Sequence, residues 1–416
     1  MFPTMKLLHT ADWHLGKRLE QFSRLAEQQA VLDEICAIAE AEDPDVVLIA
    51  GDLYDQINPS VEAAELLYRT LKRLANDGRR AVVGIAGNHD SPDRLEAPDP
   101  LARACGILLL GYPHSEVTPF ALPSGLAVHR SAPGFVELVL PRQAAPLRLL
   151  LTPYANELRL RKALDPDHSA AALRELLQGH WTQLAEQYCD AQGVNVLMAH
   201  LFVSAAGREA EMEALEDEGE KSVLTVGGAE PIYPHNFPAS LQYVALGHLH
   251  GYIPVQMEPY PVVYSSSPLA YSVDDRQPQK QVVLVEVEPG GASILRRIPL
   301  QTGKRVLRQR CDSVEEALRW LAAHPDCLVE LTVATEAHLT AQDRKRLLDS
   351  HAGIVRIIPE FADEALMRFT SGKQIDLSRS VESLFADYFA HKKGQPINED
   401  LLALLREVLA EDEEGS

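Results

Sequence analysis

Short apolar runs alternate with amphipathic stretches from Lys6 to about Ser272. The runs VVLIA, AVVGIA, NVLMA and YVALG are apolar at nearly every position, which is typical of strands covered on both faces. Residues 25–43 instead repeat apolar side chains at helical spacing, at Leu25, Val31, Leu32, Ile35 and Ile38. That helix is expected to pack on the sheet, so the alternation predicts a layered α/β domain.

A second arrangement follows residue 280. Residues 281–300 predict a hairpin that turns at Pro289-Gly290-Gly291 and either completes the first sheet or leads into the next module. Residues 301–361 predict the order strand, helix, strand, helix, strand. The helices begin with capping residues, Ser313 paired with Glu316 and Thr340 paired with Asp343. This unit is expected to form a small α/β domain.

The C-terminal region predicts two short helices after the polar segment 370–379. The first, within 380–394, places Val381, Leu384, Phe385, Tyr388 and Phe389 on one face. The second, within 398–414, carries Leu401, Leu402, Leu404, Leu405, Val408 and Leu409. Side chains this apolar need a surface to cover them, which is either the rest of the chain or a partner protein.

A length of 416 residues suggests two or three domains. The formal charge of −21 argues against binding nucleic acid by bulk attraction, although much of the acid is concentrated in residues 209–220 and 411–416. Two basic patches, 69–80 and 159–162, are interpreted as solvated helix faces.

No apolar run is long enough for a membrane span, and no secretory signal is recognisable. The five cysteines lack CxxC pairs and suit reduced thiols buried in the core of a cytosolic protein.

Five apolar runs break at their ends into acids, amides or histidines. The candidates for metal ligands are Asp12, His14, Asp52, Asn88, His200, His248 and His250. Oxygen and imidazole ligands without thiolates suit Mn²⁺, Fe or Zn²⁺ better than Ca²⁺. Gly51, Gly87 and Gly247 would allow the tight turns that bring such side chains together.

Seven ligands are enough for two adjacent cations if one carboxylate bridges them, an arrangement that suits displacement at a phosphoester. His89 and Asp55 are the catalytic candidates, His89 as proton donor or transition-state contact. Hydrogen bonding to a ligand or helix capping would also explain Asp55 and Asp90. His9 and His129 are interpreted as satisfied core histidines.

The motifs DWH, GDLYD, GNHD, AHLF and GHLH resemble those of the calcineurin-like metallophosphoesterases. The longer stretches LHTADWHLGK and GDLYDQINPS are similar to the SbcD branch of that superfamily, and the likeness covers the whole chain. The resemblance implies a four-layer α/β fold, a β-sandwich flanked by helices. It also implies three regions: a nuclease domain at 1–280, a small α/β capping domain on the DNA-binding side at 281–365, and a linker with a C-terminal helical pair at 366–416 that binds the ATPase SbcC.

The resemblance further implies two Mn²⁺ ions, with Mg²⁺ or other divalent ions as substitutes. Asp12, His14, Asp52 and His250 would hold one ion, and Asp52, Asn88, His200 and His248 the other. His89 would take the acid or transition-state role. The implied activity is 3′-to-5′ exonuclease and endonuclease cleavage of DNA ends and hairpins, regulated by ATP in SbcC, in DNA repair, recombination and replication.

The resemblance also implies a homodimer, which forms a heterotetramer with SbcC. It implies a cytoplasmic location in association with the nucleoid. The absence of a GxxxxGK[ST] loop from this sequence agrees with ATP binding by the partner.

Two other functions are compatible with the residues. One is a phosphoesterase for small or protein phosphates, using the same metal site. The other is a scaffold that tethers an ATPase without catalysis, for which missing ligands would be the signature, and none is missing.

Overall fold

The computed structural model describes residues 4–160, 169–213, 231–273, 275, 279–335 and 339–361, with the single residues or short pieces 384–386, 389, 401–402 and 405. The chain divides into two compact units. Unit 1 comprises Met1–Leu307 with Asp326–Leu328, and unit 2 comprises Arg308–Pro325 with Val329–Ser416.

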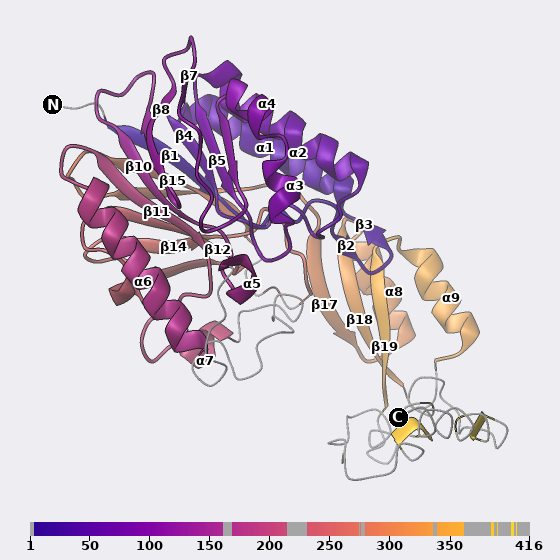
Figure 1. Cartoon of the computed structure of the whole chain (residues 1–416). Coiled ribbons are helices and arrows are strands. Elements are labelled where there is room, and N and C mark those ends of the chain that lie inside the picture. Colours follow the sequence, from indigo (N-terminus) through magenta and orange to yellow (C-terminus); the bar gives the residue numbers. More distant parts are fainter. Residues whose placement is uncertain are drawn as a thin grey trace. The chain divides into compact units, whose positions relative to one another are not determined.

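Unit 1 is built on two stacked sheets (Figure 1). The six-stranded sheet has the order β16 (Ile294–Pro299), β15 (Gln281–Val287), β1 (Met5–Thr10), β4 (Val46–Ile49), β5 (Ala81–Ile85), β6 (Ile107–Leu110). The eight-stranded sheet has the order β13 (Tyr252–Gln256), β14 (Val262–Ser265), β12 (Tyr243–Gly247), β11 (Val194–His200), β10 (Leu147–Thr152), β9 (Phe135–Val139), β8 (Ala127–Ala132), β7 (Phe120–Ala121). β2 (Arg18–Leu19) and β3 (Phe22–Ser23) form a small separate ribbon.

The apolar strands of unit 1 are buried on both faces, as their sequence pattern predicts. Leu48 and Met198 belong to the core cluster between the sheets, whereas Val47, next to Leu48, belongs to the cluster beneath the helices. α1 (Leu25–Glu42) and α2 (Val61–Ala75) cover the six-stranded sheet, and α6 (Ser169–Tyr188) covers the other through Trp181. Helices, two sheets and helices therefore make four layers, and the predicted fold class is confirmed for the described residues.

Short helices occupy the connections of unit 1. They are the 3₁₀ turn Asn76–Gly78, α3 (Pro92–Glu96), α4 (Asp99–Ala104), α5 (Glu157–Leu160), α7 (Glu209–Glu213) and the 3₁₀ turn Pro234–Asn236. No helix within the described ranges is both long and apolar enough to cross a membrane.

The hairpin predicted after residue 280 completes the six-stranded sheet. β15 pairs antiparallel with both β1 and β16, and the amide of Gly291 closes the turn by donating to the carbonyl of Glu288 at 2.9 Å. The boundary expected at residue 280 therefore falls inside unit 1, because β15 has its hydrogen-bond partners in the central sheet. The functions assigned to the three regions stay predictions.

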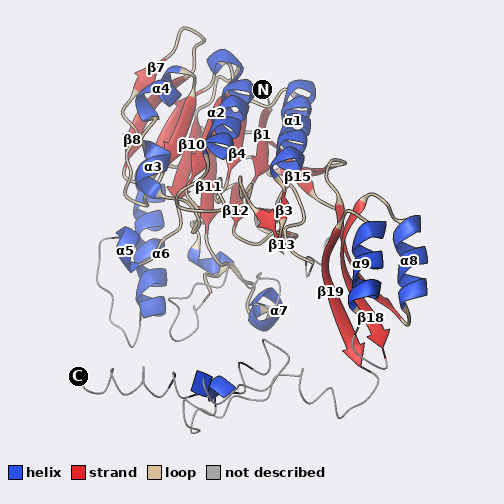
Figure 2. Cartoon of the chain, turned by 90° about the vertical axis from the view of Figure 1, so that its right-hand side faces the viewer, coloured by secondary structure: helices blue, strands red, loops and turns tan. Residues whose placement is uncertain are grey.

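Unit 2 has the predicted strand and helix order. Its elements are β17 (Arg305–Cys311), α8 (Val314–Ala323), β18 (Cys327–Thr335), α9 (Ala341–Ser350) and β19 (Ile354–Phe361), with the sheet order β17-β18-β19; the first residues of β17 and β18 are counted with unit 1. Figure 2 shows both helices on one face of this sheet. Ser313 accepts a hydrogen bond from the amide of Glu316, and Thr340 does the same for Asp343, so both predicted caps form. Apart from 384–386, 389, 401–402 and 405, the two predicted C-terminal helices lie outside the described residues, as do residues 214–220 of the acidic segment.

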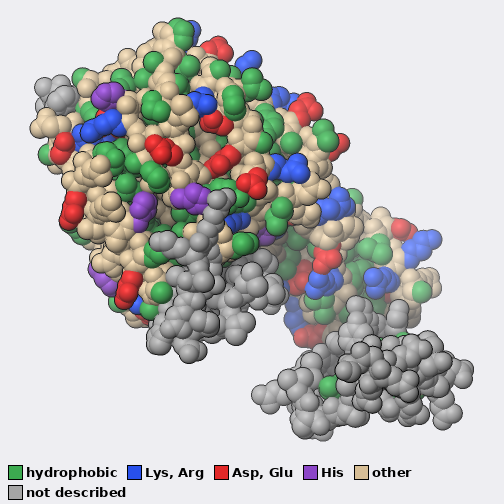
Figure 3. Space-filling view, viewed as in Figure 1, with side chains coloured by type: hydrophobic (Ala, Val, Ile, Leu, Met, Phe, Trp, Pro, Cys, Tyr) green, Lys and Arg blue, Asp and Glu red, His purple; other side chains and the backbone are tan. Residues whose placement is uncertain are grey.

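Several side chains differ from their sequence interpretation. Arg80 and Arg159, which fall in the two basic patches, are buried rather than solvated. The side chain of His129 is 67% exposed and lies 3.0 Å from Glu137, so it is paired but is not a core residue. Cys105 and Cys189 are half-buried, whereas the remaining three cysteines are buried and all five are free thiols. Acidic and basic side chains lie interspersed over the described part of the face of unit 1 drawn in Figure 3.

Candidate metal centre

The five motif strands end at one edge of the sandwich. β1, β4 and β5 are parallel neighbours in one sheet, and β11 and β12 are parallel neighbours in the other. The carboxyl ends of parallel strands meet at one edge of a sheet, where ligands collect in α/β folds. All seven predicted ligands lie at or just after these strand ends, and the structure brings them together.

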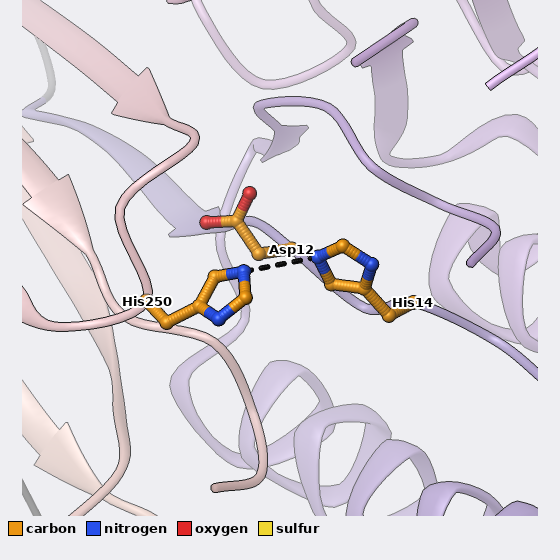
Figure 4. Close-up of side chains that lie close together, drawn as sticks. All are labelled: Asp12, His14 and His250. Carbon is orange, nitrogen blue, oxygen red and sulfur yellow. Dashed lines mark hydrogen bonds between the residues drawn. The ribbon is translucent and has the colours of Figure 1, made fainter. Parts of the chain in front are cut away.

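The first group of side chains consists of Asp12, His14 and His250. Their ligand atoms lie within 4.8 Å of one another. Figure 4 shows the two imidazoles turned toward each other, with Nε2 of His14 3.0 Å from Nε2 of His250 and the Asp12 carboxylate beside them. Two nitrogens each about 2.1 Å from a shared cation, at right angles, would be separated by about 3.0 Å. The donor set and its spacing therefore fit a divalent cation.

The second group consists of Asn88, His200 and His248. Oδ1 of Asn88 lies 2.8 Å from Nε2 of His200 and 3.2 Å from Nδ1 of His248. His200 and Asn88 come from strands of different sheets, so this group joins the two halves of the sandwich. An amide oxygen and two imidazoles suit a borderline divalent metal.

Asp52 lies between the two groups. Its Oδ2 is 3.6 Å from Nε2 of His14 in the first group and 3.3 Å from Nε2 of His200 in the second. Asp52 therefore lies within reach of both groups of candidate ligands.

Backbone groups orient these ligands. The amide of His248 donates to Oδ1 of Asp12, and the amide of His89 donates to Oδ1 of Asp52, each at 2.9 Å. Nδ1 of His200 donates to the carbonyl of Ala50 at 2.9 Å, which leaves Nε2 as the ligand atom. Oδ2 of Asp12 is buried and accepts no hydrogen bond from the described residues. A bound cation would satisfy this oxygen.

The backbone is strained at the ligands themselves. Positive φ angles occur at Asp12 (56°), His14 (44°), Asp52 (48°) and His248 (111°). Non-glycine residues adopt this region rarely and at an energetic cost, and such residues cluster at functional sites.

Glycine is required beside the ligands because the packing leaves no space for a Cβ atom. A Cβ on Gly51 would lie 2.1 Å from Nδ1 of His200, and one on Gly87 would lie 2.1 Å from Oδ1 of Asp52. A Cβ on Gly247 would lie 1.8 Å from the carbonyl oxygen of Ala50. The three glycines predicted to allow close approach do so.

Burial and charge shift the pKa values of the ligands in opposite directions. Burial raises the pKa of Asp12 to about 6, against the attraction of His200 and His250. Burial alone would lower the pKa of His200, but the carboxylates of Asp52 and Asp12 outweigh it and raise that pKa to about 9. The pocket thus concentrates negative charge that a proton or a cation must balance.

The two catalytic candidates lie beside the first group. A ring nitrogen of His89 lies within 4.8 Å of ligand atoms of His14 and Asp52. Oδ1 of Asp55 is 3.5 Å from Nδ1 of His14 and 2.9 Å from Nζ of Lys17. Burial alone would raise the pKa of Asp55, but hydrogen bonds from His14 and Lys17 hold it below its usual value. These contacts favour hydrogen bonding to a ligand as the role of Asp55.

Asp90 and His9 have structural contacts. The Asp90 carboxylate accepts hydrogen bonds from the amides of Leu53, Tyr54 and Gly87 at 2.9–3.0 Å, and it joins the loops after β4 and β5. His9 is buried with Nδ1 2.8 Å from the Tyr243 hydroxyl, as expected for a core histidine.

Sequence reasoning missed the buried polar residues that hold the ligand loops. Nε2 of Gln28 donates to the carbonyl of His14 at 2.6 Å, and Nζ of Lys280 donates to the carbonyl of His250 at 2.9 Å. Arg159 holds the loop after β5 in the same manner. Only Gln28 had a local signal, since it lies on the otherwise apolar face of α1.

Comparison with known proteins gives one family. The family model described as calcineurin-like phosphoesterase matches residues 5–131. The D component of the SbcCD nuclease of Bacillus subtilis (strain 168) is 32% identical over 418 residues, covering 99% of each chain. The protein of the same name from Rhodobacter capsulatus is 33% identical over 313 residues, covering 73% of this chain and 71% of that one. A solved structure, a dimetal phosphatase from Danio rerio, is 13% identical with a TM-score of 0.37 and covers 70% of this chain and 98% of its own.

The likeness to the Bacillus subtilis protein spans both units and the C-terminal region, and the family model matches the part that contains β1, β4 and β5. The chain therefore belongs to the SbcD family of nuclease subunits, within the calcineurin-like metallophosphoesterases.

Proposed function

We propose that this chain is the nuclease subunit of an SbcCD-type complex and hydrolyses DNA phosphodiester bonds with two Mn²⁺ ions. Its family makes it a metal-dependent phosphodiesterase. The observation that carries the proposal is the position of Asp52, whose Oδ2 faces both His14 and His200. A shared carboxylate suits the paired cations that activate a water and neutralise charge on the phosphoryl oxygens.

In this proposal Asp12, His14, Asp52 and His250 hold one cation, and Asp52, Asn88, His200 and His248 hold the other. The grouping of Asp12 with His14 and His250 and the contacts of Asn88 with His200 and His248 support that assignment. Mn²⁺ suits a mixed set of carboxylate, amide and imidazole ligands, and Mg²⁺ or another divalent ion could substitute for it.

His89 is proposed to donate a proton to the leaving oxygen or to stabilise charge that develops there. Its Nδ1 is engaged by the carbonyl of Asp55 at 2.9 Å, so its Nε2 is the nitrogen that can exchange a proton. Asp55 is proposed to act through His14, by orienting the ring and by maintaining its basicity.

The substrate and partner proposals rest on the family. The relatives are named as D components of the SbcCD nuclease, which supports a nuclease that works with SbcC. DNA ends and hairpins as substrates, and ATP binding by SbcC, are further parts of the proposal. We propose 3′-to-5′ exonuclease and endonuclease activity in DNA repair, recombination and replication. We also propose a homodimer within a heterotetramer, a cytoplasmic and nucleoid-associated location, DNA contact by the region predicted as the capping domain, and SbcC binding by residues 366–416.

The test is a cleavage assay on blunt and hairpin DNA with Mn²⁺, Mg²⁺ or EDTA, with and without SbcC and ATP. Cleavage that requires a divalent ion and is lost in Asp52→Asn is the expected result. Asp33→Asn is the matched control, because Asp33 is an exposed carboxylate on α1 that pairs with Arg73. Hydrolysis of phosphopeptides or small phosphate esters with DNA left intact would overturn the proposal, as would cleavage in EDTA.

The partner assignment has a separate test. A chain truncated before Asp376 should fail to co-elute with SbcC on a sizing column while it retains its bound metal. Co-elution of the truncated chain would refute the assignment.

A further inference from the structure

Arg159 is a buried cation beside the candidate metal centre. Only 9% of the residue is exposed, and its guanidinium donates to three carbonyls of one loop. Nη1 lies 2.7 Å from the backbone carbonyl oxygen of Gly87. Nη2 lies 2.8 Å from the carbonyl oxygen of Asp90 and 3.3 Å from the carbonyl oxygen of Asn88. One side chain thus binds most of the carbonyls of the loop that carries Asn88 and His89.

The amides of the same loop are held by carboxylates. The amide of Gly87 donates to Asp90, and the amide of His89 donates to Asp52, each at 2.9 Å. The carbonyls therefore bind the guanidinium while these amides bind acids. Both sets of hydrogen bonds are largely shielded from water, so removal of either leaves buried polar groups without partners.

Arg159 reaches this loop from the opposite sheet. It lies in α5, after β10 of the eight-stranded sheet, whereas the loop follows β5 of the six-stranded sheet. The amide of Tyr154 donates to the carbonyl of Ala86 at 2.8 Å, and the guanidinium lies 5.2 Å from the centre of the Tyr154 ring. The amide of Arg159 donates to Oδ1 of Asn156 at 2.9 Å, which anchors the start of α5.

We propose that Arg159 is a positioning residue for the second metal position. It fixes the loop after β5 so that the Asn88 oxygen meets His200 and His248 while His89 stays beside Asp52. The activity readouts of this inference rest on the proposed nuclease function. Its metal-binding and exchange readouts do not.

Arg80 provides a matched control. It is also a buried arginine, 3% exposed, and it donates to the carbonyls of Pro44, Leu74 and Ala39 at 2.8–3.0 Å. These carbonyls belong to the amino-terminal side of β4 and to the ends of α1 and α2, away from the ligand loops. Arg80→Gln should therefore cost stability in the same way without affecting the metal centre.

The experiment compares Arg159→Gln, Arg159→Lys and Arg80→Gln with the unmodified full chain. In Arg159→Gln, calorimetric titration with Mn²⁺ should show the weaker of two binding steps reduced by about 10- to 100-fold, the range seen when a residue supporting a ligand is removed. Hydrogen exchange of the 86–90 amides in metal-free protein should become at least several-fold faster. Arg159→Lys should recover part of both losses, since it keeps the charge but not the three-way donation.

Under the proposed function, kcat for DNA cleavage at saturating Mn²⁺ should fall by about 10-fold or more in Arg159→Gln, with KM for DNA changed little. If the unmodified chain cleaves no DNA, the proposed function fails, and the binding and exchange readouts still test Arg159. If Arg159→Gln does not fold, the same measurements are made on Arg159→Lys. A Mn²⁺ affinity and a rate of hydrogen exchange equal to those of the unmodified chain would then overturn the inference. Equal effects in Arg80→Gln would overturn it as well.

Discussion

Nδ1 of His89 lies 2.9 Å from the backbone carbonyl oxygen of Asp55. A carbonyl oxygen only accepts hydrogen bonds, so Nδ1 carries the proton and the tautomer of His89 is set by the loop after β4. The ring also stands edge-on to that of His14, with 4.8 Å between their centres. His89 lies in the loop after β5, but its ring is oriented by Asp55 in the loop after β4. The ring is thereby held beside the candidate ligands that these two loops carry.

His89→Gln should reduce DNA cleavage by about 100-fold or more while Mn²⁺ affinity stays unchanged, because general acid catalysis typically contributes that much. Single-turnover cleavage and Mn²⁺ titration measure the two effects. His129→Gln, which alters an exposed histidine on β8, should leave both unchanged. Full activity in His89→Gln would remove this residue from the mechanism.

Asp55→Asn should weaken Mn²⁺ binding by about 10-fold, because the neutral amide no longer supports the basicity of His14. Lys17→Met should have a smaller effect, since it removes only the partner of Asp55. Calorimetric titration distinguishes the two variants. If Asp55→Asn instead abolished cleavage with Mn²⁺ affinity intact, a direct catalytic role for Asp55 would be the better account.

Removal of metal should destabilise the protein, because the buried Asp12 and Asp52 carboxylates then have a protonated imidazole in place of divalent cations to balance their charge. Mn²⁺ at 100 times its dissociation constant should add about 2.7 kcal/mol to the free energy of unfolding. Asp12→Asn should raise the melting temperature in EDTA and abolish most of the gain from Mn²⁺. Identical melting curves of the unmodified protein in EDTA and Mn²⁺ would contradict this account of the site.

Gly87→Ala should destabilise the protein by about 1–3 kcal/mol and weaken metal binding, because its Cβ would overlap Oδ1 of Asp52. Gly179→Ala is the matched control. It lies within α6, and an added Cβ would meet no described atom within 4 Å beyond the local helix backbone, so the same substitution should stabilise the helix by about 1 kcal/mol. Denaturant unfolding checks both, and a Gly87→Ala protein with normal stability and metal affinity would show that the loop can move aside.

The pH dependence of stability should contain a contribution from His9. Burial lowers its pKa to about 3, so the unfolded chain, with a pKa near 6.5, binds the proton more readily. Its contribution is therefore fully present above pH 6.5 and is lost as pH falls from 6.5 toward 3. Between pH 7 and pH 5 the loss should be about 2 kcal/mol.

His9→Asn retains a polar atom near Nδ1 to meet Tyr243 and should remove this part of the pH dependence. Urea unfolding of the two proteins at pH 7 and pH 5 gives the comparison. Parallel pH profiles would mean that His9 is protonated without unfolding.

Local patterns were sufficient to predict the layers and the strand ends. The apolar runs that stop at Gly51 and Gly87 and continue with Asp or Asn are visible within a few residues. The length of each run predicts the strand that precedes the glycine, β4 or β5. Capping signals such as Ser313 and Thr340 are equally local, and both caps form. These features need no knowledge of distant parts of the chain.

Contacts between segments far apart in the chain were beyond the reach of the sequence pattern. The hairpin after residue 280 had two possible destinations, and pairing of β15 with β1 decided between them. Arg80 and Arg159 resembled ordinary surface arginines because their partners are backbone carbonyls, which any residue type can supply. His129 looked buried on its strand, but the exposed face of β8 left it in solvent.

The sequence by itself determined which residue types stand at the carboxyl ends of the strands, because strand length, turn and polarity are encoded locally. Only the tertiary structure decided that Asp52 lies between two groups of candidate ligands and that Arg159 donates hydrogen bonds to the loop that carries Asn88. Those positions depend on the stacking of two sheets from distant parts of the chain. The contacts between the sheets are not encoded in the local pattern of apolar and polar residues of either one.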